Sequence, residues 1–212
     1  MSHPFNHDWF RQLPVVGILR SFKLADIERL VPASIAGGLR NIEITMNSEG
    51  AEELISRACT LVGDQANVGA GTVTSIPLLE RALTAGASFI VTPTLVPEVI
   101  EACVLRGIPV MPGALSPTEI AEAWDLGATI VKLFPAEALG PGYIKAVKAP
   151  LPHIPLMPTG GVSVATLQDF KRAGADAFGV GSPLFDPKQV AAENWDWFRI
   201  QAERFAQAFK QA

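Results

Sequence analysis

The segment Leu126-Gly127-Ala128-Thr129-Ile130-Val131-Lys132 places the end of one predicted helix directly before the start of a predicted strand. Near copies of this segment stand at residues 85–91 and 173–180. In each copy a glycine suits the left-handed position that ends a helix, and β-branched or aromatic residues then begin a strand. The repetition indicates a chain built from successive strand–helix units.

Eight apolar runs in this chain are predicted to be strands, and their starts are 20–26 residues apart. The runs lie at residues 15–20, 41–46, 67–71, 89–93, 109–114, 129–135, 154–161 and 177–184. The helices expected between them lie at residues 25–36, 49–62, 75–85, 96–105, 117–126, 141–149 and 164–173. Serines are predicted to cap several of these helices: Ser48, Ser75, Ser116 and Ser163.

Eight strand–helix units in this length predict an α/β fold, a single-domain (β/α)8 TIM barrel covering residues 1–212. A doubly wound open sheet is the alternative, although no Gly-x-Gly-x-x-Gly follows the first strand. A short N-terminal helix at 8–13 is expected to plug the bottom of the barrel. A long C-terminal helix at 191–210 carries an aromatic stripe that is expected to pack on the core, with a subunit contact as the alternative.

Composition excludes several functions. The net charge is −4, the pI is near 5.4, and the basic residues are scattered, which argues against nucleic-acid or anionic-membrane binding. Neither a signal peptide nor an apolar run of about 20 residues is seen, so we expect a cytoplasmic protein. Cys59 and Cys103 are interpreted as ordinary reduced thiols.

Histidines are too few and too badly placed to suggest a metal site. His3 and His7 fall near the N-terminus, and His153 stands among prolines in a predicted loop. A catalytic metal needs a cluster of histidines and carboxylates at strand ends, which the sequence does not offer. We therefore expect no metal.

Lys132 is unusual because it lies in an apolar strand. Side-chain alternation puts Ile130, Lys132 and Phe134 on one face of that strand. Burial favours the neutral amine and lowers the lysine pKa, which makes a nucleophile suited to Schiff-base chemistry. The alternative is a lysine at a strand end that extends its amine to water.

Glu43, between Ile42 and Ile44, is predicted to face inward with Asn41 and Thr45. Taken alone, it could be a solvated strand end or an ion-pair partner of Arg20. With an inward lysine across the barrel, it forms the pair that imine chemistry needs, a nucleophile and a proton-transferring carboxyl. Burial raises the carboxyl pKa and nearby cations lower it, so the sequence leaves the net direction open.

Other inward or strand-end residues complete a candidate pocket. Arg20 is a candidate for binding a substrate carboxylate, and its alternative is an ion pair. Strand three is predicted to offer Ala70 and Thr72, and strand four offers Val91 and Pro93. Glycines at the ends of the last two strands suit a phosphate site, although they could also simply make turns. That set comprises Gly160, Gly161 and Gly181, with Ser182 beside them.

Six motifs, in order along the predicted strands, resemble the 2-keto-3-deoxy-6-phosphogluconate (KDPG) aldolase family. They lie at residues 42–45, 69–73, 91–93, 111–113, 131–136 and 158–162. The resemblance covers about residues 14–185. It implies a class I aldolase without a cofactor, commonly a homotrimer, whose partners are a phosphorylated keto acid and pyruvate. Such an enzyme splits a 2-keto-3-deoxy-6-phospho sugar acid into pyruvate and glyceraldehyde 3-phosphate.

The same resemblance assigns roles to individual residues. Lys132 matches the Schiff-base lysine and Glu43 the proton-shuttling carboxylate, while Thr72 matches a hydroxyl near the pyruvate carboxylate. Phe134 and Pro93 match pocket walls. The phosphate end is matched by Gly160, Gly161, Gly181 and Ser182.

The turn after strand two departs from the phosphogluconate pattern. Many phosphogluconate-type members carry an arginine there, whereas this chain has Met46-Asn47-Ser48. The phosphogalactonate (KDPGal) branch is more similar. It has an arginine like Arg20 after strand one and a segment whose sequence is similar to residues 139–145. Thr159 instead matches the phosphogluconate branch, at a position expected to touch the substrate C4 hydroxyl. The substrate epimer is therefore open.

Two other functions remain as alternatives. One is a phosphate-binding barrel isomerase that uses Glu43 as a base and Lys132 as an electrostatic group. The other is a non-catalytic relative that binds a phosphorylated metabolite.

Overall fold

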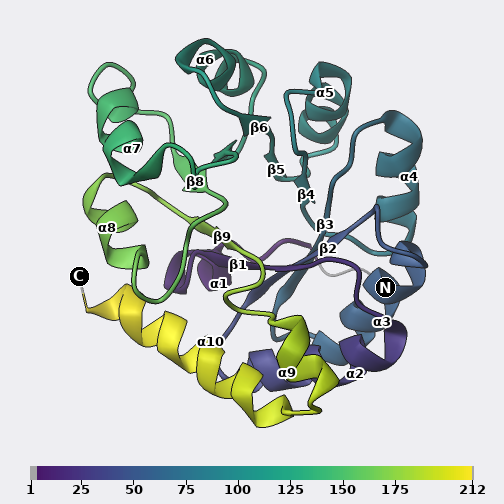
Figure 1. The fold of residues 1–212 in the computed structure, drawn as a ribbon. Helices are drawn as coiled ribbons and strands as arrows, with labels where there is room; N and C mark the ends of the chain where they lie inside the picture. The colour runs from purple at the N-terminus through teal and green to yellow at the C-terminus, as the bar shows by residue number, and fades with distance from the viewer. Residues whose placement is uncertain (1–3, 212) are drawn as a thin grey trace.

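In this computed structural model, residues 4–211 are described, and they form nine strands and ten helices (Figure 1). The strands are β1 (Val15–Leu19), β2 (Asn41–Thr45), β3 (Asn67–Gly71), β4 (Ile90–Val91), β5 (Val110–Met111), β6 (Gly113–Ala114), β7 (Val131–Leu133), β8 (Leu156–Pro158) and β9 (Phe178–Val180). The helices are α1 (His7–Gln12), α2 (Leu24–Ala36), α3 (Ala51–Val62), α4 (Ile76–Thr84), α5 (Pro97–Leu105), α6 (Pro117–Asp125), α7 (Gly140–Lys148), α8 (Leu167–Arg172), α9 (Pro187–Ala191) and α10 (Trp195–Lys210).

The strands are all parallel and curl into a barrel with the larger helices outside (Figure 1). One sheet has the order β5-β4-β3-β2-β1-β9 and the other the order β6-β7-β8. β1 pairs with both β2 and β9, and a bridge between Thr159 and Gly179 joins the end of β8 to β9. This closure confirms the predicted TIM barrel, and the open doubly wound alternative is wrong.

The fifth predicted strand is divided into β5 and β6. Pro112 stands between them, and a proline has no N–H to donate to a neighbouring strand. Its carbonyl still accepts a hydrogen bond from the Lys132 N–H at 2.8 Å. The chain therefore passes from one sheet to the other without opening the barrel.

Helix ends differ from prediction at three places. Ser116 caps α6 as predicted, through a capping box with Glu119. Gly50, not Ser48, is the N-cap of α3, and α8 begins after Thr166 rather than after Ser163. The helix predicted at 191–210 begins only at Trp195, as α10, because Glu193 has φ +52°, a left-handed backbone that no helix can continue through; Ala191 is instead the last residue of the short α9.

Apolar side chains form two layers, one on each face of the curled sheet. The larger lies between the sheet and the helices, and the smaller fills the barrel with Val16, Phe89, Val91, Met111, Ile130, Met157 and Ala177. Ile42 and Ile44 belong to the outer layer, as the alternation predicts. Ala70 does too, so the prediction that it faces inward is wrong. Gly69 and Gly71 take the inward positions of β3, because a Cβ on either would meet the side chains of Phe89 or Glu43.

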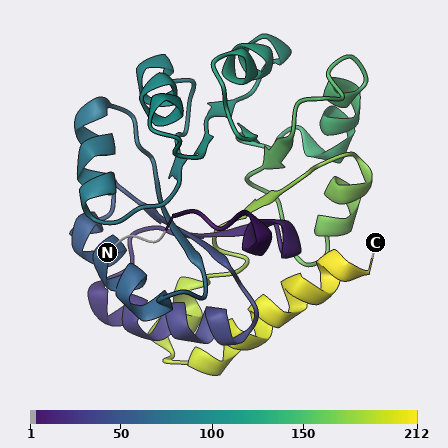
Figure 2. The same cartoon turned by 180° about the vertical axis from the view of Figure 1, so that it is seen from behind.

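The floor of the barrel is closed by α1 and the segment before it, as predicted (Figure 2). Phe5 and Phe10 pack against the interior cluster, and the Phe5 and Phe89 ring centroids are 5.7 Å apart. The Asn67 side-chain oxygen accepts from the Asn6 N–H at 2.7 Å, and its amide donates to Asn41 Oδ1 at 2.9 Å. Asn41 in turn donates to the Leu13 carbonyl at 3.0 Å.

The aromatic stripe of α10 packs on the outer core, as expected. Phe198 and Phe205 are fully buried, and Ala202 is almost so. α10 runs along α2, close enough that a Cβ on Gly37 would lie 2.2 Å from the Arg199 carbonyl oxygen. Within residues 4–211, no helix combines the length and apolarity that crossing a membrane requires.

Candidate active site

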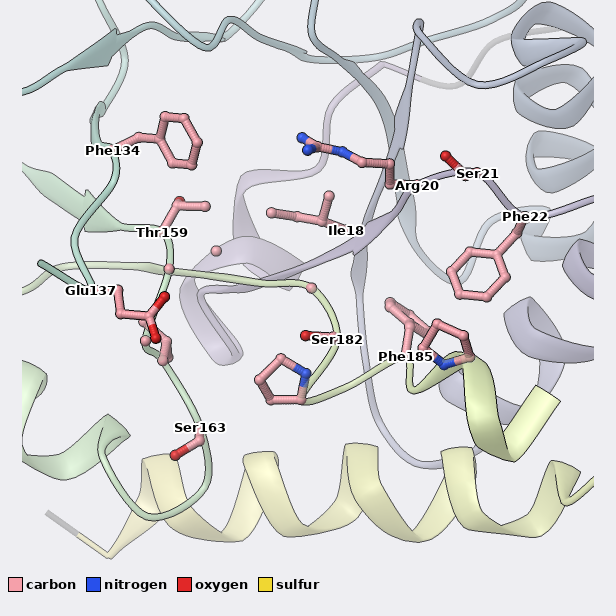
Figure 3. A pocket seen from close by; sticks show the side chains of 17 residues that line it. Ile18, Arg20, Ser21, Phe22, Phe134, Glu137, Thr159, Ser163, Ser182 and Phe185 are labelled. Atoms are coloured by element: carbon pink, nitrogen blue, oxygen red, sulfur yellow. The ribbon is translucent and has the colours of Figure 1, made fainter. Parts of the chain in front are cut away.

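A cavity of about 560 Å³ opens at the carboxyl ends of the strands (Figure 3). Its walls come from the segments that follow β1, β7, β8 and β9. Ile18 and Arg20 lie on one side, and Phe134, Glu137 and Thr159 lie on the other. In a barrel of this kind the strand ends are where functional side chains gather.

Lys132 lies on β7 and is buried, with only 4% of its surface exposed. Its Nζ is 5.0 Å from the centroid of the Phe134 ring, so these two side chains share a face as the alternation predicts. Burial lowers the pKa of Lys132, and the Arg20 charge lowers it further, against the opposing effect of Glu43. These effects favour the neutral amine, which is the form of lysine that acts as a nucleophile.

Glu43 lies on β2 and is 1% exposed. Burial raises the pKa of its carboxyl more than the charges of Lys132 and Arg20 lower it. A carboxyl whose pKa is raised keeps its proton to a higher pH than an exposed carboxyl and can donate it to a bound group. The net shift of the Glu43 pKa, whose direction the sequence left open, is therefore upward.

The carboxyl of Glu43 fits only because β3 has a glycine opposite it. A Cβ on Gly71 would lie 1.7 Å from Glu43 Oε1. The motif at residues 69–72 therefore allows the Glu43 carboxyl to approach the backbone of β3 closely. Within residues 4–211, neither Glu43 nor Lys132 forms an ion pair.

Unpartnered polar atoms gather at this site. Among residues 4–211, the buried side-chain oxygens or nitrogens without a hydrogen-bond partner are Glu43 Oε1, Glu43 Oε2 and Thr159 Oγ1. Leaving such a group unpaired typically costs about 1–3 kcal/mol. Gly179 gives Thr159 its room, because a Cβ there would lie 2.2 Å from Thr159 Oγ1. Atoms of this kind are ready to bind polar groups of a ligand.

Arg20 is exposed and extends over the cavity toward Phe134 (Figure 3). Its charge acts on both Glu43 and Lys132. Within the described chain its side chain has no hydrogen bond or ion pair, so the expected alternative of an ion pair with Glu43 is not seen. A free guanidinium in this position suits a carboxylate ligand.

The opposite part of the cavity is lined by the four residues that were predicted to bind a phosphate group. Gly160 has φ +97° and Gly161 φ +74°, both in the left-handed region that favours glycine. Gly181 and Ser182 lie across from them at the end of β9. The structure thus brings together four residues that follow two strand ends, Pro158 and Val180, which are 22 positions apart in the sequence.

Four predicted site residues do not line this cavity: the buried Lys132 and Glu43, and also Thr72 and Pro93. Thr72 is half-buried and has φ +57°, which bends the chain sharply where β3 ends. Pro93 is half-buried after β4, where its carbonyl abuts Gly113. Their roles stay predictions.

No group of three His, Cys, Asp or Glu side chains within residues 4–211 is arranged to hold a metal. His7 packs against Phe5, and His153 packs against Trp124 on the outside of the barrel. His3 lies outside the described residues.

Several cavity residues were not predicted. Glu137 and Ser163 line the phosphate end, while Phe22 and Phe185 line the side near Arg20. Glu137 lies four residues after the end of β7 and could have been found from its position in the loop at the barrel mouth. The two phenylalanines give no such signal, since an aromatic residue in a loop is equally expected in the core.

Comparisons with known proteins agree with this geometry. The family model for KDPG and KHG aldolases matches residues 7–202. The chain is 36% identical over 205 residues to the 2-dehydro-3-deoxy-6-phosphogalactonate aldolase of Escherichia coli (strain K12), covering 96% of this chain and 98% of that protein. It is 37% identical over 195 residues to the 2-dehydro-3-deoxy-phosphogluconate aldolase of Pseudoalteromonas atlantica (strain T6c / ATCC BAA-1087), covering 90% and 89%.

Solved structures give the same result. The "Native KDPGal structure" superimposes with a TM-score of 0.88 at 35% identity, covering 94% of this chain and 95% of that one. The KDPG aldolase of Legionella pneumophila, with pyruvate captured as a covalent carbinolamine intermediate, has a TM-score of 0.85 at 26% identity, covering 92% and 95%.

The fold and the buried lysine–carboxyl pair define a barrel enzyme of the class I aldolase type, a carbon–carbon lyase. The chain belongs to the KDPG and KHG aldolase family. The family predicted from the motifs is therefore confirmed.

Proposed function

We propose that this site cleaves a 2-keto-3-deoxy-6-phospho sugar acid to pyruvate and glyceraldehyde 3-phosphate through an imine on Lys132. The observation that carries the proposal is the Lys132 amine, buried with a lowered pKa, near the unpartnered and raised-pKa carboxyl of Glu43. The names of the relatives support the choice of substrate.

The reaction begins when the neutral Lys132 amine attacks the C2 ketone and forms a carbinolamine. Glu43 donates a proton to the departing hydroxyl, water leaves, and a protonated imine remains. Glu43, now a carboxylate, takes the proton of the C4 hydroxyl. The C3–C4 electron pair moves toward the imine, which becomes an enamine as the aldehyde departs. Protonation at C3 and hydrolysis then release pyruvate and the free amine.

The rest of the cavity holds the two ends of the substrate in this proposal. Arg20 binds the carboxylate in a two-pronged way, with the Thr72 hydroxyl nearby. Phe134 and Pro93 are the apolar walls. The phosphate lies against the backbone and hydroxyl donors of Gly160, Gly161, Gly181 and Ser182.

Borohydride reduction in the presence of pyruvate tests the imine. We expect an irreversible mass increase located on Lys132 in the wild type and none in a Lys132→Met variant. Absence of this adduct from the wild type would favour the alternatives, an isomerase or a non-catalytic relative. Turnover of a phosphorylated sugar without an adduct separates the isomerase from the binding protein.

The epimer preference rests on Thr159. Its unpartnered Oγ1, which lies in the cavity wall, supports a contact with the C4 hydroxyl, the centre at which the gluconate and galactonate substrates differ. Identity to the named relatives, 36% and 37%, does not separate the two substrates, so we propose that both are cleaved. Pyruvate release from the two epimers, assayed side by side, tests this, and Thr159→Val should change their ratio.

We also propose that residues 1–212 act as one domain and assemble as a cytoplasmic homotrimer. The family match across residues 7–202 supports one domain. Leu105, 87% exposed, and Val104, 45% exposed, at the end of α5 are apolar side chains that a subunit contact would cover. Light scattering coupled to size-exclusion chromatography measures the oligomer, and a monomer would contradict the trimer.

A further inference from the structure

Ser48 joins the turn after β2 to the loop after β1. Its Oγ accepts a hydrogen bond from the Ser21 N–H at 2.9 Å and lies 3.0 Å from Thr45 Oγ1. Thr45 is fully buried and Ser48 is 8% exposed. Ser48 was predicted to cap a helix, but the N-cap of α3 is Gly50, and the Ser48 hydroxyl bonds to the loop at Ser21 instead.

The residue that Ser48 binds has an uncommon backbone. Ser21 has φ +60°, in the left-handed region. For a residue with a Cβ this conformation is strained, because the Cβ comes too close to the following carbonyl oxygen. The hydrogen bond that the Ser21 N–H donates to the buried Ser48 Oγ offsets part of that strain and holds the loop in one shape.

The conformation of Ser21 bears directly on Arg20, its neighbour in the chain. Arg20 extends into the cavity with no protein partner among residues 4–211 (Figure 3). With no hydrogen bond or ion pair to another described residue, the guanidinium takes its place mainly from the backbone at Arg20. That backbone is held on one side by β1 and on the other by the Ser21–Ser48 bond.

We propose that Ser48 is a positioning residue that fixes Arg20 for binding the substrate carboxylate. The inference rests on the proposed function. It also gives the turn at residues 46–48 a part in carboxylate binding: this turn carries no arginine of its own and instead supports the arginine of the neighbouring strand. A hydroxyl at position 48 is then needed for carboxylate affinity but not for the chemistry at Lys132.

The test compares pyruvate with its neutral methyl ester in borohydride trapping. In the wild type, the half-saturating concentration should be lower for pyruvate than for the ester, because Arg20 binds the free carboxylate. Ser48→Ala should raise the pyruvate value about 3- to 10-fold, the usual effect of one lost hydrogen bond, and leave the ester value nearly unchanged. Ser48→Thr, which keeps the hydroxyl, should restore the wild-type ratio.

Two further variants decide whether the effect passes through Arg20. In an Arg20→Ala background, Ser48→Ala should cause no additional loss of pyruvate preference, as expected for two groups acting as one unit. Ser34→Ala removes another buried hydroxyl, bonded to the Leu30 carbonyl in α2, and should leave both half-saturating concentrations unchanged. If Ser48→Ala does not fold, Ser48→Cys supplies a similar size with a weak acceptor.

An equal rise for pyruvate and ester, or a full Ser48→Ala effect without Arg20, would overturn the positioning role. An unchanged ratio in a folded Ser48→Ala protein would do the same. These results leave the proposed function intact as long as the wild type is trapped by pyruvate. Failure of the wild type to be trapped would instead overturn the proposed function itself.

Discussion

At the floor of the barrel, Asn41 on β2 is buried and hydrogen-bonded, whereas Glu43, two residues further along the same strand, is buried without a partner. Both side chains face the interior, so strand alternation alone does not distinguish them. What differs is the surroundings: the floor supplies Asn67, Asn6 and backbone carbonyls, while Glu43 has Gly71 opposite it and no hydrogen-bond donor for its carboxyl among the described residues.

The difference shows how one strand can serve stability at one end and chemistry at the other. A satisfied buried amide fixes its neighbours and contributes about 0.5–1.5 kcal/mol per hydrogen bond. An unsatisfied buried carboxyl reduces stability but is free to bind and transfer a proton. Changes at the mouth should therefore reduce activity and preserve stability, and changes at the floor should do the reverse.

The largest effect is expected at Lys132. Lys132→Met should lower turnover by about 10⁴-fold or more, because it removes the nucleophile. The variant should be at least as stable as the wild type at pH 7, because burial penalises the protonated amine. That penalty is fully present below the folded pKa and disappears as the pH rises past the unfolded value of 10.5. Initial rates and thermal melts at pH 7 and pH 10 measure both effects.

A matched control for Lys132 is Lys148 on α7, whose amine pairs with Asp176 at 2.7 Å and donates to the Ile154 carbonyl. Lys148→Met should lower stability by about 1–2 kcal/mol and leave turnover unchanged. Loss of activity in this variant would contradict the expected difference between Lys132, inside the barrel, and Lys148, on its outer helix.

The next largest effect is expected at Glu43. Glu43→Gln should slow turnover about 10²–10⁴-fold, as for a lost general acid–base group, and still allow imine trapping. Because the folded pKa of this carboxyl is raised, its ionisation reduces stability once the pH rises above the unfolded value of 4.5. The Gln variant should therefore melt higher than the wild type at pH 8 and equally at pH 4. Equal melting at both pH values would contradict the raised pKa.

Two glycines of β3 sharpen the comparison within a single strand. Gly71→Ala places a Cβ against the Glu43 carboxyl and should lower turnover about 10–100-fold by displacing it. Gly69→Ala places a Cβ 2.5 Å from the buried Phe89 ring and should cost about 1–3 kcal/mol of stability. Rates corrected for the folded fraction, with unfolding by urea, separate the two results. Equal losses of activity from both variants would contradict a special role for the space at Gly71.

The smallest effect on activity is expected at the floor. Asn67→Ala leaves the Asn6 N–H and Asn41 Oδ1 without their partner, and should cost about 2–4 kcal/mol of stability. The corresponding fall in melting temperature is roughly 5–15 °C for a chain of this size. The kcat of the folded fraction should stay within about twofold of the wild type. A selective fall in kcat would show that the floor also shapes the site.

Much of the fold follows from the sequence, because repeated glycine-terminated helices and apolar runs admit few arrangements other than a closed parallel barrel. The inward lysine strand and the glycines of the last two strand ends also followed from alternation and order. Three details did not. Pro112 divides the fifth strand, Ala70 faces outward because β3 turns its glycines inward, and Glu193 separates α9 from α10. The orientation of β3 depends on residues from other strands, because Phe89 and Glu43 leave no room for a Cβ at Gly69 and Gly71.

By itself the sequence determined the barrel, the family and the residue types that its chemistry needs, since these are properties of local periodicity and of motifs in fixed order. Only the tertiary structure decided the direction of the Glu43 pKa, the space that Gly71 and Gly179 leave, and the use of Ser48 by the loop of Arg20. The physical reason is that desolvation, clearance and hydrogen-bond partners are set by atoms brought together across strands, and the linear order of residues does not specify those distances.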